Sequence, residues 1–277
     1  MEQFISKPAT ASPAPEVSDL FKTYPVQTVE PAAIKEWLKK GWADLQANPL
    51  ASLFYGVIFA IVGIILSVFS AANPAFMVAF TSGFFLVGPF LALGLYMLSW
   101  QRDQGKKIDF GASLMAIRHN ALGLGLYALT LSFLMLLWVP ASAMMIALFF
   151  NNIGSLSGMS GYAALWEGLT QMNNGFLFTL SFIGVGLLFA LVAFATGVVT
   201  VPILIERKAD IMTAIATSLK VCMTNPKTML LWAMTITGII GLGLVTFNLG
   251  LILAMPLVAH ASWHAYRDLI AKNASIR

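Results

Sequence analysis

Apolar positions in this chain gather into uncharged runs of roughly 20 residues or more, and polar stretches separate them. A run of that length is what an α-helix needs to cross the hydrocarbon core of a bilayer. The runs lack the strict alternation of barrel strands, and backbone in lipid must satisfy its own hydrogen bonds. The pattern therefore predicts an all-α, polytopic transmembrane bundle with spans at about Ser52–Ser70, Phe76–Trp100, Ala121–Phe150, Phe176–Ile205, Thr228–Phe247 and Leu249–Tyr266.

The last two predicted spans are separated only by Asn248 and its neighbours. Gly and Asn accept the left-handed backbone conformation that a tight turn requires. Gly241, Gly243, Asn248 and Gly250 therefore predict a tight turn between these two helices.

Polar stretches before the predicted hairpins have the pattern of surface helices. Ala32–Ala47 places Ile34, Trp37, Leu38, Gly41, Trp42 and Leu45 on one predicted apolar face, with Asp44 elsewhere. Asp109 is a candidate N-cap for a second short helix through Arg118, and Asp210 for a third through Met223. We expect each helix to lie at the membrane surface.

An asparagine ends each of these surface helices, and a predicted span follows it. The residues are Asn48, Asn120 and Asn225. Seven positions later stands an aromatic residue (Tyr55, Tyr127 or Trp232), and each returning span contains a proline (Pro89, Pro202 or Pro256). This concurrence predicts three helical hairpins, each preceded by a cytoplasmic amphipathic helix.

The cationic residues predict the orientation. All 16 Lys and Arg residues lie before the first span, between the second and third, between the fourth and fifth, or after the sixth. The other connections, Ala71–Ala75, Asn151–Gly175 and the turn at Asn248, contain none. The positive-inside rule therefore places the N-terminus and the C-terminus in the cytoplasm.

Composition supports the membrane class, since 58% of the 277 residues are hydrophobic, only 10% are charged, and the mean hydropathy is +0.82. A soluble domain carries about 25% charged residues. The net charge of +4 does not indicate a nucleic-acid partner, because the basic residues sit at helix ends. The predicted partners are the lipid bilayer and other membrane-protein subunits.

The predicted organisation has three parts. Residues 1–31 are polar and rich in Pro, Ala, Ser and Thr, which predicts a disordered cytoplasmic tail. Residues 32–270 form the six-helix membrane domain, and residues 271–277 form a second cytoplasmic tail.

Candidate chemistry is sparse. His260 and His264 lie one helical turn apart, and we expect His119 at the same membrane depth, so these three are weak candidates for a metal site. The alternative is that they are interfacial histidines that bond to lipid headgroups or loop carbonyls. Cys222 is the single cysteine, which excludes a thiolate cluster. We predict no cofactor.

The sequence contains no motif of a soluble enzyme, and no Asp, Glu, Lys or Arg falls within any of the six predicted spans. The chain is therefore predicted not to be an enzyme, and a proton-coupled pump is disfavoured. Three functions stay open: a non-catalytic accessory or scaffold component of a membrane complex, a transporter or channel for an uncharged or lipid-like solute, and a metal- or haem-binding respiratory accessory protein.

Two segments carry a family resemblance: GPFLALGLY at 88–96 and HASWHAYRD at 260–268. They resemble signatures of bacterial predicted integral membrane proteins that carry a domain of unknown function. Some members are labelled cytochrome c oxidase subunit I-like. The similarity runs from about Glu30 to Leu269, and it implies a six-helix protein of the bacterial inner membrane without supplying an activity.

The histidine count tests the oxidase label. A haem-copper catalytic subunit needs about six histidines as metal ligands. This chain has three. We therefore expect that it is not such a subunit.

Overall fold

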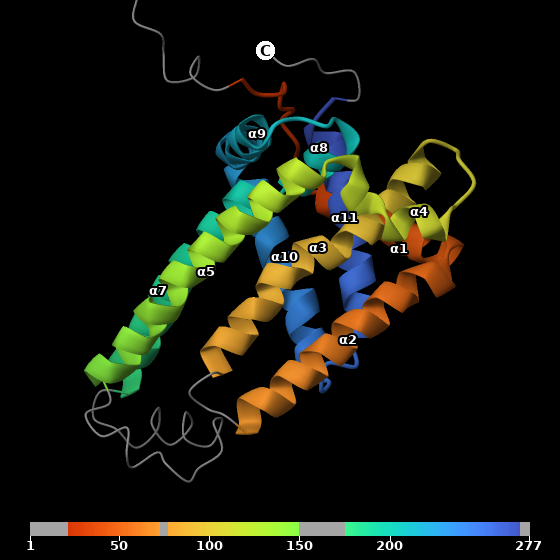
Figure 1. Cartoon of the computed structure of the whole chain (residues 1–277). Coiled ribbons are helices and arrows are strands. Elements are labelled where there is room, and N and C mark those ends of the chain that lie inside the picture. The colour runs from red at the N-terminus through yellow and green to blue at the C-terminus, as the bar shows by residue number, and fades with distance from the viewer. Residues whose placement is uncertain (1–21, 73–76, 150–174, 272–277) are drawn as a thin grey trace, which may run out of the picture.

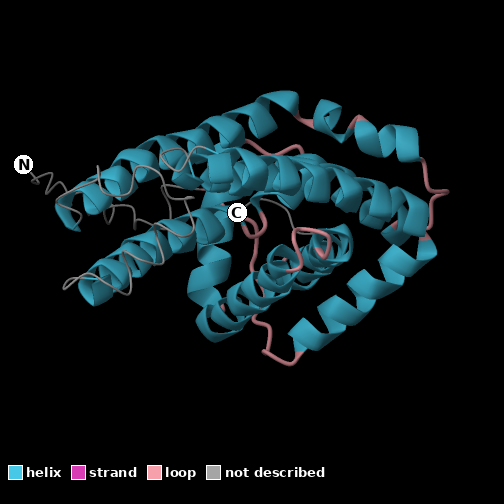
Figure 2. Cartoon of the chain, turned by 90° about the horizontal axis from the view of Figure 1, so that it is seen from below, coloured by secondary structure: helices cyan, strands magenta, loops and turns pink. Residues whose placement is uncertain are grey.

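The computed structural model describes residues 22–72, 77–149 and 175–271. These residues are almost entirely helical, and apart from one antiparallel bridge between Val26 and Ile270 they contain no strand (Figure 2). Four described segments are long and apolar enough to cross a membrane: Pro49–Phe69, Ala121–Phe149, Gly175–Glu206 and Pro226–Val245. The predicted class, an all-α helical membrane bundle, is confirmed.

The bounds of the spans agree closely with the predicted ones. The helices are α2 Pro49–Ala72, α3 Met77–Asp103, α5 Ala121–Phe149, α7 Gly175–Gly197, α8 Thr200–Glu206, α10 Pro226–Val245 and α11 Leu251–Leu269. The second and sixth predicted spans correspond to α3 and α11, which are not among the four segments above. Crossing of the membrane by all six therefore stays a prediction.

The fourth predicted span, Phe176–Ile205, corresponds to the apolar segment Gly175–Glu206, which consists of two helices, α7 and α8. The chain leaves the helical conformation between α7 and α8, at Val199, with φ −125° and ψ −2°. Pro202 has no N–H to donate to the carbonyl of Val198 four residues earlier, so one helical hydrogen bond is missing at this point. The break divides the span near its predicted cytoplasmic end.

The helix α11 is the centre of the bundle. It packs against α2, α3, α10 and the surface helix α1, Ala33–Ala47 (Figure 1). Close approach depends on glycine: a Cβ at Gly56 of α2 would lie 2.0 Å from the carbonyl oxygen of Ile252, and one at Gly41 of α1 would lie 2.7 Å from the backbone nitrogen of Ala261. Because protein covers α11, its polar residues are not exposed to lipid.

The three predicted surface helices exist and lie at the same end of the bundle (Figure 1). They are α1, α4 Phe110–Leu114 with the following 3-10 turn Ala116–His119, and α9 Ile211–Thr224. Both predicted caps are confirmed, since Asp109 accepts a hydrogen bond from the Ala112 N–H and Asp210 from the Thr213 N–H.

The backbone supports the predicted repeat. The asparagines that end the surface helices share one unusual conformation, with φ and ψ of −139° and 63° at Asn48, −155° and 65° at Asn120, and −125° and 50° at Asn225. The aromatic residue seven positions after each asparagine is buried in all three cases. The predicted turn between α10 and α11 is also confirmed, with Asn248 at φ 66°.

The predicted disordered tail, residues 1–31, is wrong for residues 22–31, which lie against α9, α10 and the end of α11. The Val29 N–H donates to Asn225 Oδ1 at 2.7 Å, and the Thr228 hydroxyl donates to the Val29 carbonyl at 2.7 Å. Tyr24 is buried. Side chains of α9 and α10 thus satisfy the backbone of this segment and hold it in place. The remainder of that tail, most of the connection Asn151–Gly175 and residues 272–277 lie outside the described residues.

Candidate functional site

The buried face of α1 carries a carboxylate. Trp37, Gly41, Asp44 and Leu45 form this face, and Asp44 is only 4% exposed. The prediction that Asp44 lies off this face, and that Trp42 lies on it, is wrong. Asp44 follows Trp37 by seven residues, which is about two helical turns, so the two side chains point the same way.

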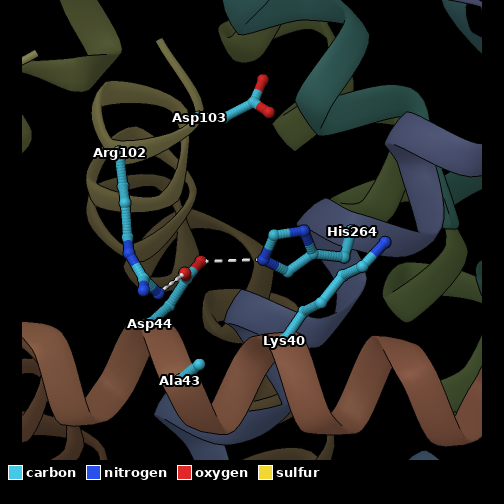
Figure 3. Close-up of a pocket in the computed structure, with 6 residues that line it drawn as sticks. All are labelled: Lys40, Ala43, Asp44, Arg102, Asp103 and His264. Carbon is cyan, nitrogen blue, oxygen red and sulfur yellow. Dashed lines mark hydrogen bonds and ion pairs between the residues drawn. The ribbon is translucent and has the colours of Figure 1, made fainter. Parts of the chain in front are cut away.

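Three polar partners surround the Asp44 carboxylate, and Figure 3 shows two of them, Arg102 and His264. Ser99 of α3 donates to Oδ2 at 2.6 Å, His264 Nε2 of α11 lies 3.0 Å from the same oxygen, and Arg102 of α3 pairs with Oδ1. Burial of the carboxyl opposes its ionisation, but the hydrogen bonds of His264 and Ser99 outweigh it and hold the pKa of Asp44 below its ordinary value. Asp44 is therefore ionised and joins three helices.

His260 extends this network into the bundle. An ionised Asp44 only accepts, so Ser99 gives it its one hydroxyl proton and must accept from His260 Nδ1–H, at 2.7 Å. The other ring nitrogen, Nε2, then accepts from the Ser52 hydroxyl of α2, at 2.9 Å. The Ser52–His260–Ser99–Asp44 chain has the hydroxyl–imidazole–carboxylate order of serine hydrolases with one serine inserted. Ser52 is 0% exposed, so no substrate reaches its hydroxyl in this conformation.

A second network joins α3, α8 and α11. Arg267 pairs with Asp103 at 2.5 Å and with Glu206 at 2.6 Å. Tyr266 donates to Glu206 and accepts from Arg207 Nε at 2.9 Å. The charged ends of three helices therefore neutralise one another inside the protein.

The HASWHAYRD segment supplies the α11 side of both networks. Its last residue, Asp268, accepts a hydrogen bond from Trp37 Nε1 at 2.8 Å and lies 3.9 Å from Lys40 Nζ. The segment thus bonds to α1, α2, α3 and α8. The alternative that His260 bonds to lipid headgroups or loop carbonyls is wrong, because two buried serines hold its ring.

A pocket of about 240 Å³ opens beside Asp44 (Figure 3). It is lined by Lys40, Ala43, Asp44, Arg102, Asp103 and His264. α1, α3 and α11 all contribute to it.

The three histidines named as metal candidates are not brought together. His260 and His264 both join the Asp44 network, whereas His119 is exposed and its ring lies 6.3 Å from the Trp100 ring. Within the described ranges, no three His, Cys, Asp or Glu side chains form a group able to hold a metal ion.

Sequence reasoning missed Ser52, Asp44, Ser99 and Arg102. The spacing of Asp44 from Trp37 was a usable signal, because a carboxylate on an apolar helical face needs a buried partner. Ser52 and Ser99 gave no such signal, since serine is common in membrane helices.

Fold and network define an integral, multi-pass α-helical membrane protein. The sequence model of a family described as "Predicted integral membrane protein (DUF2189)" matches residues 76–206, which run from the start of α3 to the end of α8. The predicted resemblance to a membrane family of unknown function is confirmed over this region, which includes GPFLALGLY and ends before HASWHAYRD. Neither a curated protein nor a solved structure matches the chain.

Proposed function

We propose that this integral membrane protein is a non-catalytic accessory or scaffold component of a membrane complex. The observation that carries this proposal is the use of the polar groups of α11. His260, Tyr266 and Arg267 are directed to other helices of the same chain, and the first two are fully buried. The side chains of α11 with reactive groups are therefore used to join one helix to another.

The outward faces of the four apolar segments provide surface for partner subunits. Large apolar side chains are exposed along each of them, and examples are Ile61 of α2, Leu129 of α5, Leu187 of α7 and Met234 of α10. In a bilayer such faces meet either lipid or the helices of another protein, and packing decides between them.

Transport of an uncharged or lipid-like solute is the alternative that the break between α7 and α8 favours, because transporters build substrate sites at interrupted helices. At this break, however, the polar side chain of Thr200 is already bonded within the same chain. Thr200 is buried, and its hydroxyl donates to the carbonyl of Thr196 at 2.5 Å. A hydroxyl that is already bonded in this way supports the accessory role over transport.

Site-specific photo-crosslinking in native membranes tests the proposal. A photoreactive residue is placed at Ile61, Leu129, Leu187 or Met234, and at the buried Phe178 of α7 as the control. We expect at least one outward position to crosslink to a defined membrane protein that also co-purifies in mild detergent, and the Phe178 position to give no such product.

The contrary outcome is also specific. If all four outward positions crosslink only to lipid, and proteoliposomes that contain this chain alone move a neutral solute, the accessory role is wrong and transport replaces it.

A further inference from the structure

The pocket beside Asp44 has features beyond those that hold helices together. Its six lining residues come from α1, α3 and α11, and they surround one space at the end of the bundle where the surface helices lie (Figures 1 and 3). The proposed accessory role does not require a ligand in this pocket.

Both carboxylates of the pocket are already neutralised by protein. Asp44 accepts from Ser99, His264 and Arg102, and Asp103 pairs with the buried guanidinium of Arg267 at 2.5 Å. Neither carboxylate therefore needs a cation from solution. This arrangement disfavours a metal ion as the occupant of the pocket.

The cationic groups, in contrast, keep donors available. The Arg102 side chain is 42% exposed and uses one terminal nitrogen for Asp44, although a guanidinium has five N–H donors. The Lys40 side chain is 48% exposed, and its ion pair with Asp268 is long at 3.9 Å. An ammonium has three N–H donors. Two cations with spare donors at the rim of one pocket favour an anionic, oxygen-rich ligand.

His264 adds a third polar contact. Its Nε2 faces Asp44, its Nδ1 has no hydrogen-bond partner within the described part of the chain, and its side chain is 16% exposed and lines the pocket. When Nε2 carries the ring proton, Nδ1 is an acceptor. A phosphomonoester group that carries one proton offers two unprotonated oxygens, which share its negative charge, for Lys40 and Arg102, and a hydroxyl for this nitrogen.

The position of the pocket suits a phosphate at a membrane surface. Arg102 lies at the end of α3 and His264 in the last turns of α11, next to the surface helix α1. On α1 the exposed Trp42 lies between Lys40 and Asp44 in sequence, and Leu50 at the start of α2 is also exposed. Exposed tryptophan beside a span marks the depth of lipid headgroups.

We propose that the pocket lined by Lys40, Arg102 and His264 binds a phosphomonoester group. The group is carried either by a lipid headgroup, as in phosphatidic acid, or by a small soluble phosphate. Both ligands present the same phosphate group to the pocket, and the experiment below distinguishes between them.

The test uses the purified full chain in detergent micelles, with the thermal unfolding midpoint and direct binding as readouts. One arm titrates short-chain phosphatidic acid, with phosphatidylcholine of the same chain length as the comparison. The other arm titrates inorganic phosphate. The variant is Lys40→Gln, and the control is Lys39→Gln, which removes the same charge from an exposed position of α1 that does not line the pocket.

We expect phosphatidic acid or inorganic phosphate to bind with a Kd that Lys40→Gln weakens roughly tenfold and Lys39→Gln leaves unchanged, as expected for loss of one charge-assisted hydrogen bond. Binding in the lipid arm alone identifies a headgroup site, and binding in both arms identifies a site for the phosphate itself. Binding in neither arm, or equal weakening by both lysine variants, overturns the proposal. The circular dichroism of each variant establishes that it is folded.

Discussion

His264 of α11 and Asp44 of α1 are 220 positions apart in the chain, and Nε2 of the histidine lies 3.0 Å from Oδ2 of the aspartate. This contact joins the first described helix to the last one. Together with the hydrogen bond from Trp37 to Asp268, it holds the surface helix α1 along the centre of the bundle. The contact accounts for a histidine and a carboxylate inside a chain that is otherwise poor in charge.

The pH dependence of stability should report the ionised state of Asp44. Its pKa is lowered in the folded protein, so the Asp44 contribution is fully present above the unfolded value of about 3.9 and is lost as the pH falls through the folded value. We expect the free energy of unfolding in detergent to fall below about pH 4, and to fall less steeply in Asp44→Asn. The exposed Glu36→Gln variant of α1 should keep the wild-type profile. Identical profiles for wild type and Asp44→Asn would contradict this account of Asp44.

Gly56→Ala should prevent normal packing of α2 against α11. The new Cβ would lie 2.0 Å from the Ile252 carbonyl oxygen, and backbone cannot yield as a flexible side chain can. We expect a loss of roughly 1–3 kcal/mol or more, seen as a lower unfolding temperature and a smaller monodisperse fraction in size-exclusion chromatography. Gly238→Ala is the matched control, because no atom lies within 4 Å of its added Cβ. Equal behaviour of the two variants would mean that the close approach of α2 and α11 is absent.

Asn225→Ala should release the segment that precedes α1. The Asn225 side chain accepts from the Val29 N–H and donates to the Gln27 carbonyl, at 2.7 Å and 3.0 Å. We expect faster amide hydrogen exchange at residues 24–29 and little change in α2 or α5. Exchange that stays slow at Val29 in this variant would show that other contacts hold the segment.

Thiol labelling tests the predicted orientation. Burial raises the pKa of the Cys222 thiol to about 11, and Cys222→Ser removes this thiol from the experiment. In that background an impermeant reagent added to intact cells should label Phe247→Cys, at the exposed turn between α10 and α11, and should reach Lys107→Cys only after permeabilisation. The reverse pattern would place the termini on the outer side.

Local patterns predicted most of the fold. Span bounds follow from the length of apolar runs, and the caps at Asp109 and Asp210 follow from a short polar side chain before a helix. The conformation shared by the three asparagines likewise belongs to a local junction. These features depend on neighbouring residues, so the sequence contains the information directly.

The candidate site could not be predicted in this way, because it depends on which helices pack together, and local sequence patterns do not reveal the packing. Ser52, Ser99 and His260 lie on three different helices, and only the assembled bundle brings their side chains within hydrogen-bond distance. Residues 22–31 were assigned to a disordered tail for the same reason, because their partners lie almost 200 positions away, as for Val29 and Asn225.

The polar residues of α11 join helices to one another, and a double-mutant cycle between Asp44 and His264 tests this most directly. Asp44→Asn, His264→Gln and the double variant are compared with wild type by their free energies of unfolding in micelles. We predict that each single variant loses about 1.5–3 kcal/mol and that the double variant loses clearly less than the sum, with a coupling of about 0.5–3 kcal/mol. Losses that add to within about 0.5 kcal/mol would show that the two residues do not stabilise the protein through each other, and would contradict the account.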